Sequence, residues 1–126
     1  MDIEELLNIV KDAAYEVRKA LSFGYLESVY QDALLYELQS RGIDAKLEEP
    51  LQVLYKGHLV GEFKADILVE DRIIVEIKAC QNLLPVHETQ LINYLKATGI
   101  DKGLLINYGS ETFACREKDR IYHPNK

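Results

Sequence analysis

The strongest constraint in this sequence is a pair of apolar runs, residues 63–69 and 73–80, separated by the short polar stretch 70–72. Both runs are rich in Ile and Val, which predicts strand, turn and strand. A three-residue loop gives the pairs Val69/Ile73, Ile67/Val75 and Ala65/Ile77 on one face, and Leu68/Ile74, Asp66/Glu76 and Lys64/Lys78 on the other. Apolar partners match throughout, whereas a slip of one residue would scatter them over both faces. The sequence therefore predicts an antiparallel hairpin with two carboxylates and two lysines on one face.

The predicted pairing of Asp66 with Glu76 is unfavourable by itself. Two carboxylates about 4 to 5 Å apart repel each other until a cation neutralises them, and a divalent metal ion would do so. The alternative is a solvated face on which Lys64 and Lys78 serve as cross-strand partners of the acids. Because apolar residues share this face and a predicted helix follows directly, we favour a covered face and a metal-binding pair.

Length and composition narrow the class of protein. A chain of 126 residues with 48% hydrophobic and 29% charged residues predicts one globular domain. No apolar run approaches about 18 residues and the N-terminus is acidic, so neither a transmembrane helix nor a secretory signal is predicted. Cys80 and Cys115 lack metal-ligand spacing and are expected to be buried free thiols of a cytoplasmic protein. The net charge of −6 means that a nucleic-acid partner would need a local basic patch.

Hydrophobic periodicity predicts the remaining elements. They are a helix over 3–21, a helix over about 26–41, a strand over 43–55, a helix over 85–98, a buried strand over 102–108 and a last strand over 111–116. If the third helix is a crossover, the strand that follows it runs parallel to its neighbour. The polar tail from about Glu117 is predicted to fray. The expected fold class is α/β, with a mixed central sheet flanked by helices.

Four further residues have alternative interpretations. Glu27 lies in the first turn of the second helix, and if Gly24 is the cap it is the third helical residue, where an acid stabilises free backbone N–H groups. Gln90 and Tyr94 lie one turn apart on the third helix. They could form a plain polar stripe or belong to a site. His58 lies at a predicted turn and is expected to be exposed rather than a ligand.

The order of these motifs resembles the PD-(D/E)XK nuclease superfamily, whose core is a helix, a three-stranded meander, a helix and a strand. Asp66 matches its isolated acid and residues 76–78 match its E-x-K tripeptide. Residues 90–94 match the QxxxY motif of the RecB-type branch, and residues 24–30 match the heptad that names the GxxExxY protein family. The resemblance covers nearly all of residues 3–116 and implies a restriction-endonuclease-like core.

The same resemblance implies a Mg²⁺ or Mn²⁺ site that serves phosphodiester hydrolysis. Its ligands would be the carboxylates of Glu27, Asp66 and Glu76 and the backbone carbonyl of Ile77. Lys78 would orient or deprotonate the attacking water and offset the charge that develops on the phosphate. Gln90 and Tyr94 would hold a phosphate or help to fix Lys78. The number of metal ions stays open, and two cysteines are too few for an iron–sulfur cluster.

We therefore predict a metal-dependent deoxyribonuclease. Without a recognition helix or a basic run, an exonuclease or structure-dependent nuclease is favoured over a base-specific enzyme. Lys64 and Lys96 could add phosphate contacts or could be ordinary solvated lysines. One alternative is a non-cleaving nucleic-acid or protein binding module that retains the fold, which the acidic net charge favours. Another is a subunit whose DNA-binding surface forms only in a homo-oligomer or with a protein partner.

Overall fold

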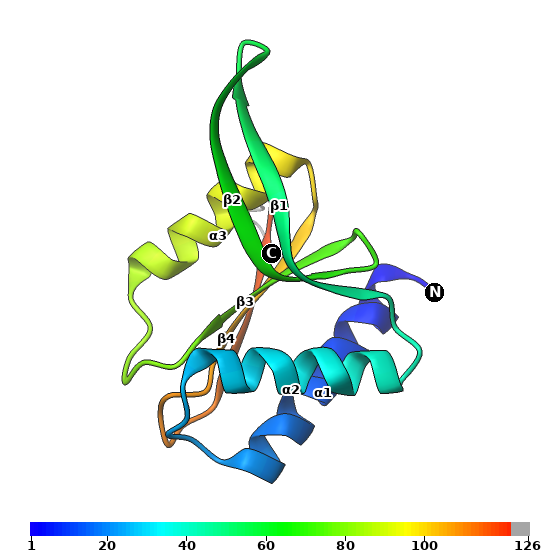
Figure 1. The fold of residues 1–126 in the computed structure, drawn as a ribbon, viewed down its shortest axis with the longest axis vertical. Coiled ribbons are helices and arrows are strands. Elements are labelled where there is room, and N and C mark those ends of the chain that lie inside the picture. The colour runs from blue at the N-terminus through cyan, green and yellow to red at the C-terminus, as the bar shows by residue number, and fades with distance from the viewer. Residues whose placement is uncertain (122–126) are drawn as a thin grey trace.

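The computed structural model describes residues 1–121, which form three helices and five strands (Figure 1). The elements are α1 (Ile3–Leu21), α2 (Glu27–Ser40), β1 (Ala45–Tyr55), β2 (His58–Val69), β3 (Ile73–Lys78), α3 (Pro85–Thr98), β4 (Lys102–Asn107) and β5 (Ala114–Asp119). The strands make one sheet in the order β1-β2-β3-β4-β5, in which β3 and β4 are parallel and the other neighbours antiparallel. This is the predicted mixed α/β arrangement, and it is a restriction-endonuclease-like fold.

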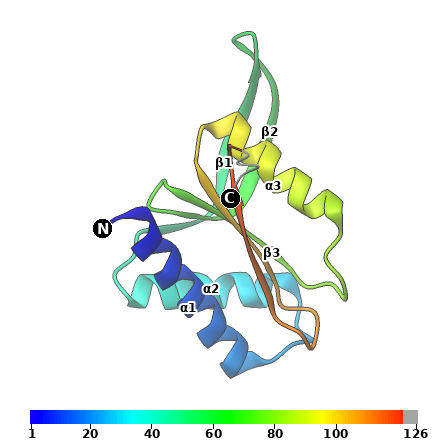
Figure 2. The same ribbon diagram turned by 180° about the vertical axis from the view of Figure 1, so that it is seen from behind.

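Helices α1 and α2 cover one face of the sheet (Figures 1 and 2). Helix α1 begins where the Asp2 carboxylate accepts a hydrogen bond from the Glu5 N–H at 2.8 Å, which satisfies one free donor of the first turn. The apolar stripe of α1 is buried against the sheet together with Tyr30 of α2. The Tyr30 ring stacks on the ring of Tyr108 with centroids 4.4 Å apart, and the Tyr108 hydroxyl donates to the Ala14 carbonyl. This larger core therefore joins both helices to the end of β4.

Helix α3 covers the opposite face over a smaller core (Figure 2). Its buried residues are Leu91 and Leu95 from α3, with Ala65, Leu68, Ile74 and Leu105 from the sheet. The helix starts at Pro85, where a missing N–H is tolerated, and ends at Gly99, whose φ of 75° is the left-handed conformation that glycine adopts readily. The crossover from β3 through α3 to β4 makes these two strands parallel, as predicted.

The predicted register of the β2–β3 hairpin is confirmed for its first three pairs. Leu68 opposes Ile74 within them, and the loop has three residues. The ladder ends after these pairs, so the predicted pairs Lys64/Lys78, Asp66/Glu76 and Ala65/Ile77 are not ladder partners. The predicted face of Ala65 is wrong, because it packs in the α3-side core whereas Ile77 packs on the other face. Beside Asp66 the backbone of β1 is irregular, with φ of 51° at Glu48, and β2 changes face there.

Several predicted boundaries also differ from the structure. Strand β1 begins at Ala45 and not at residue 43, β2 begins at His58 and not at residue 63, and β3 ends at Lys78 and not at residue 80. Leu26 is the N-cap of α2, so Glu27 is the first helical residue and not the third. Strand β5 begins at Ala114 and not at residue 111, because the preceding loop is held by the Arg18 guanidinium, which donates to the carbonyls of Ser110 and Glu111. The predicted fraying from Glu117 is wrong up to residue 119, and residues 122–126 lie outside the described part. Within residues 1–121, no helix is long and apolar enough to span a membrane.

Candidate active site

Two acids from neighbouring strands meet where the β2–β3 ladder ends. An Asp66 carboxylate oxygen accepts a hydrogen bond from the Ile77 N–H at 2.7 Å, so this side chain takes the place of the next ladder rung. Glu76 is only 7% exposed. Its Oε1 atom is buried and has no hydrogen-bond partner among the described residues. The sequence-predicted pair is therefore together, and one of its oxygens is unsatisfied.

The surroundings of this pair disfavour the ionised form of Glu76. Burial, together with the charge and hydrogen bonding of Asp66, raises the pKa of Glu76 to about 9. Lys78, at the end of β3, acts in the opposite direction but does not offset these effects. A carboxyl group with so high a pKa in a cluster with a second acid and a lysine is typical of functional sites. With its pKa at about 9, Glu76 carries a proton near neutral pH.

Helix α2, which precedes the sheet in the sequence, contacts the strand that carries Asp66. The Gln31 side-chain amide donates to the Asp66 backbone carbonyl at 3.1 Å. Glu27 lies four residues earlier and therefore on the same side of the helix, and its side chain is exposed. Within residues 1–121, no three His, Cys, Asp or Glu side chains lie close enough together to hold a metal ion. The structure thus brings Asp66 and Glu76 together and leaves Glu27 on the nearby helix face outside such a group.

Helix α3 contributes the two residues of the QxxxY motif. The Tyr94 ring stacks on the Phe63 ring of β2, with centroids 3.6 Å apart and an angle of 9° between the planes. Burial raises the pKa of Tyr94, and the negative charges of Glu76 and Asp66 raise it further. Gln90 and Tyr94 also line a surface pocket of about 490 Å³. Tyr94 therefore lies near the acidic pair, and Gln90 lies beside Tyr94 at the pocket.

Asn107 is a residue of this region that the sequence reasoning missed. Its side chain is buried, its Nδ2 donates to the Cys80 carbonyl at 2.8 Å, and its Oδ1 accepts from the N–H groups of Cys80 and Gly109. A Cβ at Gly109 would lie 2.2 Å from the Cys80 nitrogen, so only glycine fits there. These contacts hold the chain directly after Lys78. The sequence signal for Asn107 is a polar residue at the end of the buried run of β4. Nothing in the sequence indicates that Gln31 contacts Asp66.

Comparisons with known proteins agree with this geometry. The solved structure described as "Crystal structure of SSO0001" is similar, with a TM-score of 0.60 and 21% sequence identity. The matched part covers 77% of this chain and 52% of that one, so this chain spans about half of its length, and the likeness concerns the fold alone. No curated protein matches the sequence significantly. Residues 4–120 match the family model of the PD-(D/E)XK nuclease superfamily. With its five-stranded mixed sheet and its motif residues in the order of that family, the chain belongs to the PD-(D/E)XK nuclease superfamily.

Proposed function

We propose that this protein is a divalent-metal-dependent DNA phosphodiesterase that acts as an exonuclease or a structure-dependent nuclease. The observation that carries the proposal is the buried Oε1 of Glu76, which has no hydrogen-bond partner within residues 1–121 and lies in a cluster with Asp66. A buried acid in this state needs either a proton or a cation. Because the chain belongs to a nuclease superfamily, we favour a cation over a proton as the partner of Glu76.

The residues present fit a hard cation such as Mg²⁺ or Mn²⁺, which prefers oxygen ligands and retains several waters. Asp66, Glu76 and the Ile77 carbonyl would hold it, with Glu27 as a further carboxylate from α2. When bound, such an ion lowers the pKa of a coordinated water and polarises the phosphodiester. The match of residues 24–30 to the GxxExxY heptad remains a prediction, and so does the role of Glu27.

The chain's own residues would complete the reaction. Lys78, which is half-buried at the end of β3, would orient or deprotonate the attacking water and offset the charge on the phosphate. Tyr94, near the acids, and its neighbour Gln90 would hold a phosphate oxygen or the position of Lys78. Lys64 and Lys96 are exposed and would add weaker contacts to the DNA backbone. The proposal includes a cytoplasmic location, in keeping with two free cysteines.

The second candidate function is a binding module that retains the fold and does not cleave. Two observations favour it: the net charge of −6, and the lack of a three-residue metal-ligand group in the described part of the chain. Such a module would bind DNA or a protein whichever divalent metal ion is present, and it would leave the DNA intact. It could also act as one subunit of an oligomer.

A cleavage assay separates the two functions. Purified protein is incubated with labelled single- and double-stranded DNA in Mg²⁺, in Mn²⁺ and in EDTA. We expect metal-dependent cleavage that Asp66→Ala and Lys78→Ala each reduce by at least about 100-fold. The matched control is Lys19→Ala, which removes an exposed lysine paired only with Glu16 among the described residues.

Thermal melting of each variant establishes that it is folded before its activity is compared. Binding without cleavage in both metals would support the module instead. Cleavage that persists in folded Asp66→Ala and Lys78→Ala protein would contradict the proposed site.

A further inference from the structure

The distal part of the β1–β2 hairpin projects beyond the helices and the rest of the sheet (Figures 1 and 2). We define residues 50–64 as the arm. Its strands pair from Pro50 with Lys64 to Tyr55 with His58. The turn consists of Lys56 and Gly57, both with positive φ, which is the tight two-residue geometry that matches the twist of a hairpin. The arm is therefore a paired hairpin with one bulge, where the register shifts between Val53 and Leu54, and not a loose loop.

The tip of the arm exposes apolar side chains on both of its faces. Leu54, Tyr55, Leu59 and Val60 are between 55% and 61% exposed. Leu54 and Leu59 are cross-strand partners and share one face. Tyr55 is paired with His58 and lies on the other face, and Val60 is the extra residue of a bulge opposite Val53 and Leu54. A surface that docks on one partner needs one apolar face, whereas this tip is apolar on both.

The arm is connected to the candidate active site by one continuous strand. Strand β2 runs without interruption from the tip to Asp66, which lies eight residues after His58. At about 3.3 Å per residue this separation is roughly 26 Å. At the base of the arm, the Phe63 ring stacks on the ring of Tyr94. What binds at the tip is thereby joined to the acidic pair through a single strand.

The charge of the arm is opposite in sign to that of a nucleic acid. The arm carries Lys56 and Lys64 against the single acid Glu62, although the whole chain has a net charge of −6. The Lys56 ammonium lies 5.4 Å from the centre of the Tyr55 ring, so a cation and an aromatic face are presented together. Bases stack on such aromatic faces, and phosphates bind the cation.

The exposed area at the tip also argues against a stable dimer. Four side chains of this exposure offer on the order of 400 Å² of apolar surface. A typical stable interface buries roughly 800 Å² on each partner. The tip alone would therefore support only a weak contact between proteins, whereas a few side chains suffice to separate one base step.

We propose that the arm is a wedge that enters a DNA duplex at the junction with unpaired strands, with Tyr55 and the apolar residues of the tip against the exposed bases. This inference rests on the proposed function and names its substrate class, a forked or frayed DNA end. Apolar side chains inserted at a base step unstack it, and an aromatic ring then holds the freed base. One strand would be directed along β2 toward Asp66.

The test measures binding and base opening without cleavage. The probe is a forked DNA with 2-aminopurine at the first base pair of the duplex, in EDTA, with a blunt duplex of the same sequence for comparison. We expect the wild-type protein to bind the fork more tightly than the blunt duplex and to raise 2-aminopurine fluorescence. The variant that combines Tyr55→Ala and Leu59→Ala should bind the fork at least about fivefold more weakly than the wild type. It should also fail to raise the 2-aminopurine fluorescence.

The matched control is Tyr36→Ala, which removes an equally large aromatic side chain, 75% exposed, from α2. It should behave as the wild type. Equal affinity for fork and blunt duplex, a loss of affinity with no fluorescence change, or an arm variant indistinguishable from the control would each overturn the wedge. So would a dimer in light scattering that the arm variant dissociates. Fork opening by a protein that cleaves no DNA would support the wedge and refute only the nuclease. Cleavage without fork opening would support the nuclease and refute the wedge.

Discussion

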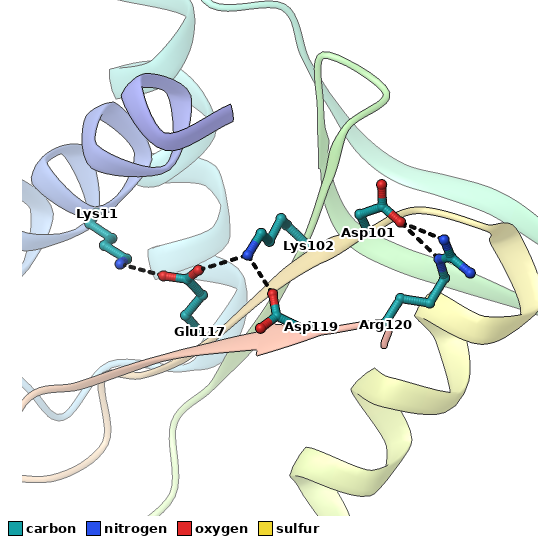
Figure 3. A network of polar contacts seen from close by, with 6 residues as sticks. All are labelled: Lys11, Asp101, Lys102, Glu117, Asp119 and Arg120. Carbon is teal, nitrogen blue, oxygen red and sulfur yellow. Dashed lines mark hydrogen bonds and ion pairs between the residues drawn. The ribbon is translucent and has the colours of Figure 1, made fainter. Parts of the chain in front are cut away.

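The two ends of the β3–β4 strand pair carry charged clusters of opposite character. Near the start of the strands lies an ion-pair network formed by Lys11, Asp101, Lys102, Glu117, Asp119 and Arg120 (Figure 3). Glu117 accepts hydrogen bonds from Lys11 at 2.8 Å and from Lys102 at 3.3 Å, and Lys102 also donates to Asp119. Near the other end lie Asp66 and Glu76, with an oxygen of Glu76 unpartnered in the described residues.

The pKa shifts at the two ends have opposite meanings. In the ion-pair network, the hydrogen bond from Lys11 lowers the pKa of Glu117, and the bond to Asp119 raises the pKa of Lys102, so both stay charged. At the acidic pair, burial raises the pKa of Glu76 to about 9. Charges that serve only the fold are balanced within it. An acid that the fold leaves unbalanced indicates a partner from outside.

The largest expected effect that tests this comparison is on stability at the acidic pair. The unfolded chain releases the Glu76 proton near its ordinary pKa and the folded chain only near 9, so the free energy of unfolding falls as pH rises through this window. Glu76→Gln removes the ionisation and should stabilise the metal-free protein at pH 8 by on the order of 3 kcal/mol. Urea denaturation in EDTA at several pH values measures it.

The control for this variant is Glu62→Gln, an exposed acid on the same strand as Asp66, which should leave stability within about 0.5 kcal/mol. A Glu76→Gln protein that is less stable than the wild type at pH 8 would show that the acidic pair is not strained.

The next effect is the response to metal. A divalent ion that replaces the proton on Glu76 binds only the folded state, and at 100 times its dissociation constant stabilises it by about 2.7 kcal/mol. We expect Mn²⁺ or Mg²⁺ to raise the melting temperature of the wild type, more strongly as pH rises toward 9. Glu76→Gln and Asp66→Asn should lose this response. An equal rise in the variants would place the ion elsewhere.

The smallest effect is expected at the ion-pair network. Lys102→Ala leaves Glu117 and Asp119 without their shared cation and should destabilise the protein by about 1 kcal/mol, less at high salt. Because the pKa of Glu117 is lowered on folding, the loss should disappear as pH falls through that folded-state pKa. Denaturation of Lys102→Ala and of the exposed-pair control Lys19→Ala measures it. A stabilising Lys102→Ala would remove the contrast between the two ends.

Much of the fold could be predicted from local pattern. The periodicity of residues 3–21 is that of a helix with one buried stripe, and α1 has these bounds. The alternation around residues 70–72 permits only one register that keeps Ile and Val covered, and Leu68 opposes Ile74 as predicted. The pattern failed at Ala65, because a change of face in a strand depends on the backbone of the neighbouring strand at Glu48.

The sequence by itself determined the order and type of the elements and the first three pairs of the β2–β3 hairpin, because these follow from periodicity and from neighbours along the chain. Only the tertiary structure decided that an oxygen of Glu76 has no partner in the described part of the chain, that Asn107 holds the chain after Lys78, and that the arm is exposed on both faces. Burial and charge balance depend on residues distant in sequence, as the pairing of Lys11 with Glu117 shows. No local pattern contains that information.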